Sequence, residues 1–204
     1  MLLTESQQAA IEHMRKYAER RRPGAERAIE EVLRMANISH AKFADAKGKV
    51  TSCARVALHF HPDRPTPENR SVAEALFQDG VYKSQFETKI SSGSVSAFPG
   101  GERDEWEKRI FAGAYQRADA TKDQRPKYGA LDLMQHPDGP APRFGSCYLL
   151  LSPECSARCT FTYLDSHQEP KEMGTLEELD DIFAALLTGV FLDDYALGQR
   201  ELTV

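Results

Sequence analysis

Val56-Ala57-Leu58-His59-Phe60-His61 is a short β-type run, and Pro62 ends it because proline cannot donate a hydrogen bond to a strand partner. The period of the apolar residues changes at this run. Residues 4–47 before it have the spacing of two or three helices, whereas most of the later runs have strand-like composition. Helices followed by a mostly antiparallel sheet with flanking helices predict an α+β fold.

The run also predicts how the chain is organised. We expect a helical segment over residues 1–52 and an α+β core over residues 53–204. Within the helical segment, Pro23-Gly24 predicts a break between two helices. In the core we expect a short helix over 72–77 that ends at Gly80, a helix over 102–115, strands over 128–134, 144–151 and 159–163, and a helix over 175–188.

Composition excludes several classes of protein. With 41% hydrophobic and 28% charged residues the chain is expected to fold as a globular protein. A net charge of −5 gives no general reason for nucleic-acid binding. The start of the sequence lacks the pattern of a signal peptide and no apolar run is long enough to span a bilayer, so we expect a cytoplasmic protein without a membrane partner. Four scattered cysteines are expected to be free thiols.

Two histidines of the first strand are candidates for chemistry. His59 and His61 are two residues apart, so their side chains leave the same face of a strand. With Asp63 they resemble the opening ligands of a metal-dependent hydrolase, for which a divalent metal is the expected cofactor. The alternative is structural: one histidine packs in the core against a backbone carbonyl, and the other caps the following turn.

A polar segment follows that suits a ligand cleft. Tyr82, Ser84, Gln85 and Glu87 alternate with apolar residues, and such a mixture can hold a ligand that has both aromatic and hydroxyl parts. Further along, Tyr128 is a candidate to stack on a base, or else to pack in the core. Arg143 is a candidate phosphate ligand, or else a residue of the rim.

Long motifs carry a resemblance to a known family, the bacterial domain of unknown function family 3626. The resemblance extends over nearly the whole chain, and the family name implies no activity. The motifs that carry it are 58–64 (LHFHPDR), 79–88 (DGVYKSQFET), 97–101 (AFPGG), 125–131 (RPKYGAL), 136–146 (HPDGPAPRFGS), 160–163 (TFTY) and 165–167 (DSH).

A weaker resemblance is to ADP-ribosyltransferases, whose early strand supplies a His or Arg to NAD and whose middle strand carries a Ser/Thr-x-Ser/Thr element. His59 or His61 matches the first element, and Thr160 with Thr162 resembles the second. This resemblance implies NAD as the cofactor. Breaking the nicotinamide bond passes through an oxocarbenium-like state, which needs positioning and a nearby carboxylate rather than a strong nucleophile.

The chain departs from both patterns at its end. Asp193-Asp194-Tyr195 is followed by Ala196-Leu197-Gly198, so that Leu197 stands where the family pattern implies the late Glu. Glu201 is offset by four positions, and Glu87 is the alternative carboxylate. The departure implies a shortened, weakly active member, a chain in which Glu87 takes the role of the late Glu, or a chain that is not a transferase.

The leading hypothesis is therefore an ADP-ribosyltransferase-like protein, a glycosyltransferase if it is active, that binds NAD and has a protein as its acceptor. In it His59, His61 and Glu87 are catalytic, and Tyr82, Ser84, Gln85, Tyr128, Arg143, Thr160 and Thr162 bind the cofactor. The alternatives are a metal-dependent hydrolase that uses His59, His61 and Asp63, and a non-catalytic, toxin-associated module that binds a nucleotide or another small molecule.

Overall fold

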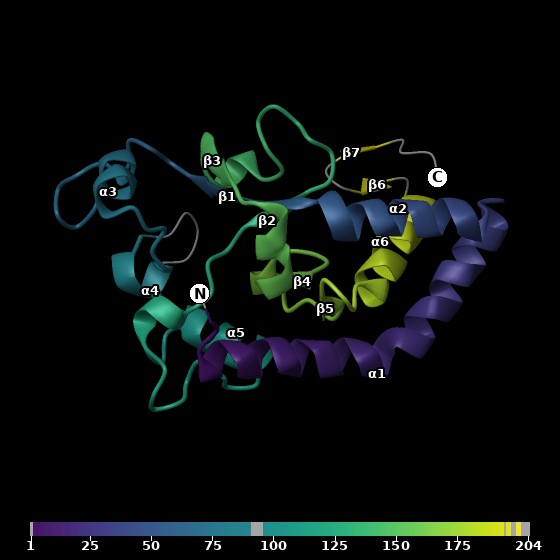
Figure 1. The fold of residues 1–204 in the computed structure, drawn as a ribbon, viewed down its shortest axis with the longest axis horizontal. Coiled ribbons are helices and arrows are strands. Elements are labelled where there is room, and N and C mark those ends of the chain that lie inside the picture. The colour runs from purple at the N-terminus through teal and green to yellow at the C-terminus, as the bar shows by residue number, and fades with distance from the viewer. Residues whose placement is uncertain (1, 91–95, 194, 197–198, 201–204) are drawn as a thin grey trace. The chain divides into compact units, whose positions relative to one another are not determined.

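The computed structural model of the chain describes residues 2–90, 96–193, 195–196 and 199–200. They form helices and short antiparallel strands (Figure 1), which confirms the α+β fold. The chain divides into two compact units, one made of Met1–Ala10 with Arg55–Ser152 and one made of Ile11–Ala54 with Pro153–Val204. Each unit is therefore built from two separate stretches of sequence, whereas the expected boundary between residues 52 and 53 is a single point in the chain.

The first unit contains a three-stranded antiparallel sheet in the order β2-β1-β3 (Figure 1). The central strand is β1, Arg55–Phe60, and its neighbours are β2, Ala130–Asp132, and β3, Cys147–Leu150. Ala57 pairs with Ala130, and His59 pairs with Tyr148. The four middle residues of β1 are buried, and because successive side chains point to opposite faces, both faces of this strand are covered.

Two helices of the first unit, α3 and α4, begin with side-chain caps and end with a left-handed residue. A capping box of Ser71 with Glu74 begins α3, and Gly80 ends it with φ +64. Another box, of Ser84 with Glu87, begins α4. The helices of this unit are α3, Val72–Asp79; α4, Gln85–Thr88; α5, Glu102–Ile110; and the short 3-10 helices η1, Lys122–Gln124, and η2, Pro142–Phe144.

The helix α1, Glu5–Met35, continues through Pro23, so the expected break at Pro23-Gly24 is wrong. Proline inside a helix removes one hydrogen bond and crowds the carbonyl four residues earlier, which bends a helix without necessarily ending it. The ribbon of α1 changes direction along its length (Figure 1). Burial of Ala25, Ile29 and Leu33 beyond the proline offsets the lost hydrogen bond.

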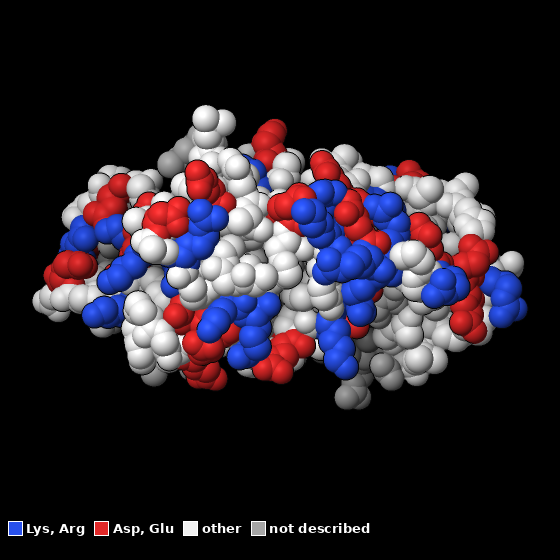
Figure 2. Space-filling view, turned by 90° about the horizontal axis from the view of Figure 1, so that it is seen from below, with Lys and Arg blue, Asp and Glu red and all other residues white. Residues whose placement is uncertain are grey.

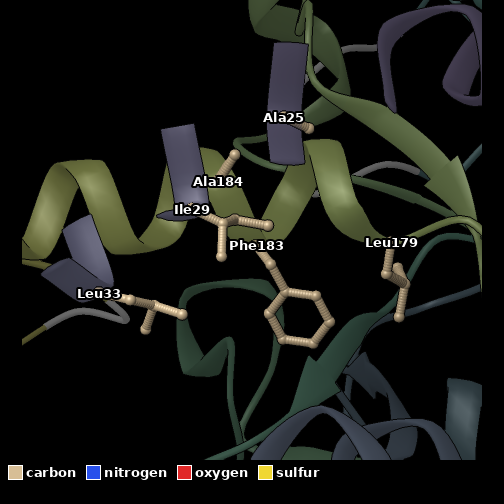
Figure 3. Close-up of a cluster of buried hydrophobic side chains, with 6 residues drawn as sticks. All are labelled: Ala25, Ile29, Leu33, Leu179, Phe183 and Ala184. Carbon is tan, nitrogen blue, oxygen red and sulfur yellow. The ribbon is translucent and has the colours of Figure 1, made fainter. Parts of the chain in front are cut away.

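The core of the second unit joins α1 to α6, Asp180–Asp193. Ala25, Ile29 and Leu33 of α1 lie against Leu179, Phe183 and Ala184 (Figure 3). Phe43 of α2, His40–Cys53, meets Phe183 edge to face at 5.8 Å. The other elements of this unit are β4, Thr160–Thr162; β5, Met173–Thr175; β6, Tyr195–Ala196; β7, Gln199–Arg200; η3, Pro153–Arg158; and η4, Ser166–Gln168.

Ion pairs fasten the same helices. Arg21 donates to Asp181 at 2.6 Å, Arg22 pairs with Glu178, and Lys47 pairs with Asp180. The predicted helix over 175–188 begins later, at Asp180, because Met173–Thr175 pairs with β4 as a strand. The arginines near Pro23 thus bind one carboxylate in the first turn of α6, that of Asp181, and one just before the helix, that of Glu178.

Two surface properties bear on partners. Within the described ranges, no helix combines the length and the apolar character that crossing a bilayer requires. On the face seen in Figure 2, acidic and basic side chains lie beside one another over much of the surface. Such mixing favours local ion pairs over a patch of one sign.

Candidate functional site

His59 lies on β1 with both ring nitrogens hydrogen-bonded to backbone. Its Nδ1 is 2.9 Å from the carbonyl oxygen of Gly145, and its Nε2 is 3.2 Å from the backbone nitrogen of Ala141. A carbonyl only accepts and an amide N–H only donates, so Nδ1 carries the proton and Nε2 is the acceptor. The imidazole is 7% exposed, and the ring of Tyr148 lies 5.1 Å from it. These contacts fix one neutral tautomer of the ring.

His61 and Asp63 do not extend this arrangement into a metal site. His61 is half-buried and Asp63 is exposed. In the part of the chain that the structure describes, which includes both histidines and Asp63, no three His, Cys, Asp or Glu side chains gather closely enough to hold a metal ion. A divalent metal would therefore need ligands that the described residues do not bring together.

Of the expected cleft residues, Tyr82 is the one bonded to the histidine segment. Its hydroxyl donates to the carbonyl oxygen of His59 at 3.1 Å, and burial raises the pKa of this phenol. Gln85 lies at the start of α4 and has a buried Oε1 without a hydrogen-bond partner. Tyr82 thus ties the start of the polar segment to the end of β1.

Ser84 and Glu87 are joined to each other by a capping box. The Ser84 hydroxyl accepts the backbone N–H of Glu87 at 3.3 Å and donates to the carbonyl of Lys122 at 2.7 Å. In return, the Glu87 carboxylate accepts the backbone N–H of Ser84 at 2.7 Å. Both side chains therefore serve the start of α4, and any ligand would compete with these bonds.

The remaining predicted residues lie elsewhere. Arg143 is exposed, and its guanidinium lies 4.5 Å above the ring of Phe144. Thr160 and Thr162 belong to β4 of the second unit, where the Thr162 hydroxyl donates to the carbonyl of Leu164 at 2.7 Å. Leu197 and Glu201, which concern the missing late Glu, lie outside the described residues.

A buried charged cluster on α5 was not predicted as a site. Arg125 pairs with Asp104 at 2.7 Å and with Glu107 at 2.8 Å. Tyr128, expected to stack on a base or pack in the core, donates its hydroxyl to the other Glu107 oxygen at 2.7 Å. Glu107 is 0% exposed.

The pattern of α5 holds a signal for this cluster. Arg103, Trp106, Glu107 and Ile110 recur at helical spacing on its buried face, so charged residues stand where apolar ones are expected.

For both Asp104 and Glu107, burial raises the pKa and hydrogen bonding lowers it, but the balance differs between the two carboxyls. Burial raises the pKa of Glu107, and the bonds from Arg125 and Tyr128 offset only part of that rise. For Asp104 burial also raises the pKa, but the hydrogen bonds from the Gly100 N–H, Gln116 and Arg125 together leave it lowered. Asp104 therefore ionises more readily than an ordinary aspartate, and Glu107 less readily than an ordinary glutamate.

Arg103 is the second guanidinium of the cluster and is 6% exposed. It lies 4.3 Å from the ring of Trp106 and 4.8 Å from the ring of Tyr128. Its Nε is buried and has no hydrogen-bond partner. An arginine held in this way is chemically suited to bind an oxyanion.

The comparisons with known proteins give a family without an activity. A family model described as "Protein of unknown function (DUF3626)" matches residues 55–204, and the chain belongs to this family. The match covers the whole described sheet of the first unit and α5. No curated protein matches the chain.

Proposed function

We propose that this chain binds NAD as an ADP-ribosyltransferase-like domain, with the nucleotide at the His59 end of β1. The observation that supports this proposal best is the fixed tautomer of His59. The Gly145 carbonyl oxygen lies 2.9 Å from Nδ1 and accepts its hydrogen bond, so Nε2 is always the acceptor. A ribose hydroxyl is a donor that matches such an acceptor.

In the unliganded chain the backbone N–H of Ala141 occupies that acceptor at 3.2 Å. A ribose hydroxyl would replace this bond, and the residues around η2 would move aside. The Tyr82 hydroxyl already binds the carbonyl of His59, so its ring is held beside the strand end that the ribose would meet. Binding and movement of the 136–145 segment are therefore coupled in this proposal.

Transfer would require a further group. In the reaction the bond between the ribose carbon and the nicotinamide nitrogen breaks, nicotinamide leaves with the electron pair, and the acceptor forms the new bond and gives up its proton. A carboxylate would stabilise the cationic sugar. Glu87 is engaged in its capping box and Glu107 has no exposed surface, so neither carboxylate is available to stabilise the cationic sugar. We therefore expect weak turnover.

Because Glu87 and Glu107 are both unavailable for catalysis, a second candidate function is a non-catalytic module that binds the nucleotide. The two candidates differ in one product, because only a transferase releases nicotinamide. A protein acceptor is part of the first candidate alone.

Calorimetric titration of NAD tests the proposal. We expect saturable binding to the wild type and a loss of at least about tenfold in His59→Gln, since the variant cannot reproduce both ring hydrogen bonds. His40→Gln is the matched control, because His40 is exposed on α2 of the other unit. Tyr82→Phe should weaken binding less than His59→Gln, because the ring stays in place.

Nicotinamide release, measured by chromatography on the same samples, then separates the candidates. Release that depends on His59 supports a transferase, and binding without release supports the binding module. NAD affinity that is equal in the wild type and in a folded His59→Gln variant would reject the His59 site, and absence of NAD binding by the wild type would reject the proposal as a whole.

A further inference from the structure

We infer that Arg103 anchors a second site, specific for an oxyanion of the phosphate class, on the buried face of α5 beside Trp106 and Tyr128. This inference does not rest on NAD binding at His59. It concerns a different residue and a different element, and it would hold for inorganic phosphates as well as for the phosphates of a nucleotide.

The first step is the cost of a buried charge. Arginine stays protonated in proteins, and moving an ion out of water costs several kcal/mol unless a partner compensates it. Arg125 follows this rule, because it pairs with two carboxylates. Arg103 does not: among the described residues it makes no hydrogen bond or ion pair, although it is only 6% exposed. A buried guanidinium nitrogen without a hydrogen-bond partner needs an explanation, and a bound oxyanion would supply the missing acceptor.

The nearby carboxylates are already engaged. Glu107 attracts Arg103 electrostatically, but its two oxygens are taken by Arg125 and Tyr128. The Asp104 oxygens are taken by Arg125, by Gln116 and by the backbone N–H of Gly100. The two carboxylates balance the charge of the two guanidiniums, but their oxygens are hydrogen-bonded to other donors. Arg103 therefore has an attractive charge nearby without a hydrogen-bonded oxygen.

Aromatic stacking leaves the binding edge of Arg103 unused. Trp106 and Tyr128 attract the face of the guanidinium through their π electrons. The N–H groups of a guanidinium lie in its plane, so stacking consumes none of them. Two parallel N–H groups in a fixed plane match two oxygens of a phosphate.

Two carboxylates of the first turn of α5 oppose an anion on this helix. Glu102 and Glu105 are both exposed to solvent, where their charge is screened, so their opposition is weak.

The fluorescence of Trp106 gives a direct readout, because it is the single tryptophan of the chain and Arg103 stacks on it. The experiment titrates inorganic pyrophosphate into the full chain. We expect a saturable change in tryptophan emission, and at least a tenfold weaker response in Arg103→Gln. Arg109→Gln removes the same charge from an exposed position of α5 and should bind pyrophosphate as the wild type does.

Arg103→Lys tests the geometry and is the variant to use if Arg103→Gln does not fold. Lysine keeps the charge but lacks the planar fork, so binding should again weaken about tenfold. Equal binding by folded Arg103→Lys or Arg103→Gln and the wild type would overturn the inference, as would a wild type that gives no saturable response.

ADP-ribose and adenosine distinguish the source of the phosphate. Tighter binding of ADP-ribose than of pyrophosphate, with no binding of adenosine at Arg103, would support a nucleotide diphosphate as the ligand. Equal binding of the two would support a free phosphate. An adenosine response that depends on Arg103 would contradict a phosphate site. A positive pyrophosphate result together with NAD affinity that is unchanged in His59→Gln would reject the His59 site and leave the anion site standing.

Discussion

Tyr128 donates its hydroxyl to Oε1 of Glu107 at 2.7 Å, while Arg125 donates to Oε2 of the same carboxylate at 2.8 Å. Glu107 has no solvent-exposed surface, so these donors replace the water that would otherwise solvate it. Tyr128 also receives the indole N–H of Trp106 at 3.3 Å. The segment before β2 is thereby bonded to the buried face of α5.

Tyr128→Phe should destabilise the fold by about 1–3 kcal/mol, because it leaves a buried carboxylate oxygen without its donor. Tyr115→Phe is the matched control. Tyr115 is also buried, but its hydroxyl makes no hydrogen bond among the described residues. Urea unfolding followed by circular dichroism should show a loss for Tyr128→Phe alone, and equal effects would mean that the bond to Glu107 adds nothing.

In the second unit Asp181→Asn should cost about 1–2 kcal/mol of unfolding free energy, since it removes the charge from the bond that Arg21 makes at 2.6 Å. The Asp181 side chain is only 7% exposed, so water can replace little of the lost interaction with Arg21. Glu12→Gln breaks an ion pair whose Glu side chain is 45% exposed and should leave stability unchanged. Thermal unfolding of both variants measures the difference, and equal midpoints would contradict a role for Asp181 in fastening α6.

Local signals made part of the fold predictable. The run at 56–61 contains most of β1, which ends at Phe60, before His61. Gly80 ends α3 because its φ of +64 suits glycine. The expected break at Pro23-Gly24 failed because burial of Ile29 and Leu33 against α6 depends on residues about 150 positions later, which no local pattern contains.

The candidate site was predicted in part for the same reason. Ser84 and Glu87 have the S-x-x-E spacing of a capping box, and that local pattern accounts for both side chains in the structure. His59 was identified as a residue of interest, but its partners Ala141 and Gly145 are more than 80 positions away. The pairing of Arg125 with Glu107 is likewise a tertiary event, so only the charges on the buried face of α5 hinted at it.

Gly139→Ala should test how closely the 136–145 segment packs on His59. Gly139 has φ +74, and a Cβ there would lie 2.6 Å from Nε2 of His59. Gly113 has φ +76 and open space around a Cβ, so Gly113→Ala carries the backbone strain without the clash. We expect about 1–3 kcal/mol more destabilisation for Gly139→Ala by urea unfolding. Equal losses would show that the segment does not pack on the imidazole.

The raised pKa of Glu107 predicts a pH dependence of stability with a defined sign. A carboxyl whose pKa is higher in the folded state than its ordinary value of 4.5 holds its proton more tightly when folded. Its stabilising contribution is fully present below the ordinary value, and it is lost as the pH rises through the raised folded value. The lowered pKa of Asp104 acts in a separate window, because its contribution is lost as the pH falls toward and below the ordinary value of 3.8.

Glu107→Gln removes the first of these titrations. The unfolding free energy of the wild type minus that of Glu107→Gln should therefore fall as the pH rises above the ordinary value of 4.5, with a slope of at most about 1.4 kcal/mol per pH unit for one proton. Urea unfolding followed by circular dichroism at several pH values measures this difference. Glu105→Gln, an exposed change on the same helix, is the control for general charge effects. If the difference for Glu107→Gln rises with pH instead, the paired Arg125 outweighs burial and Glu107 is held as a carboxylate.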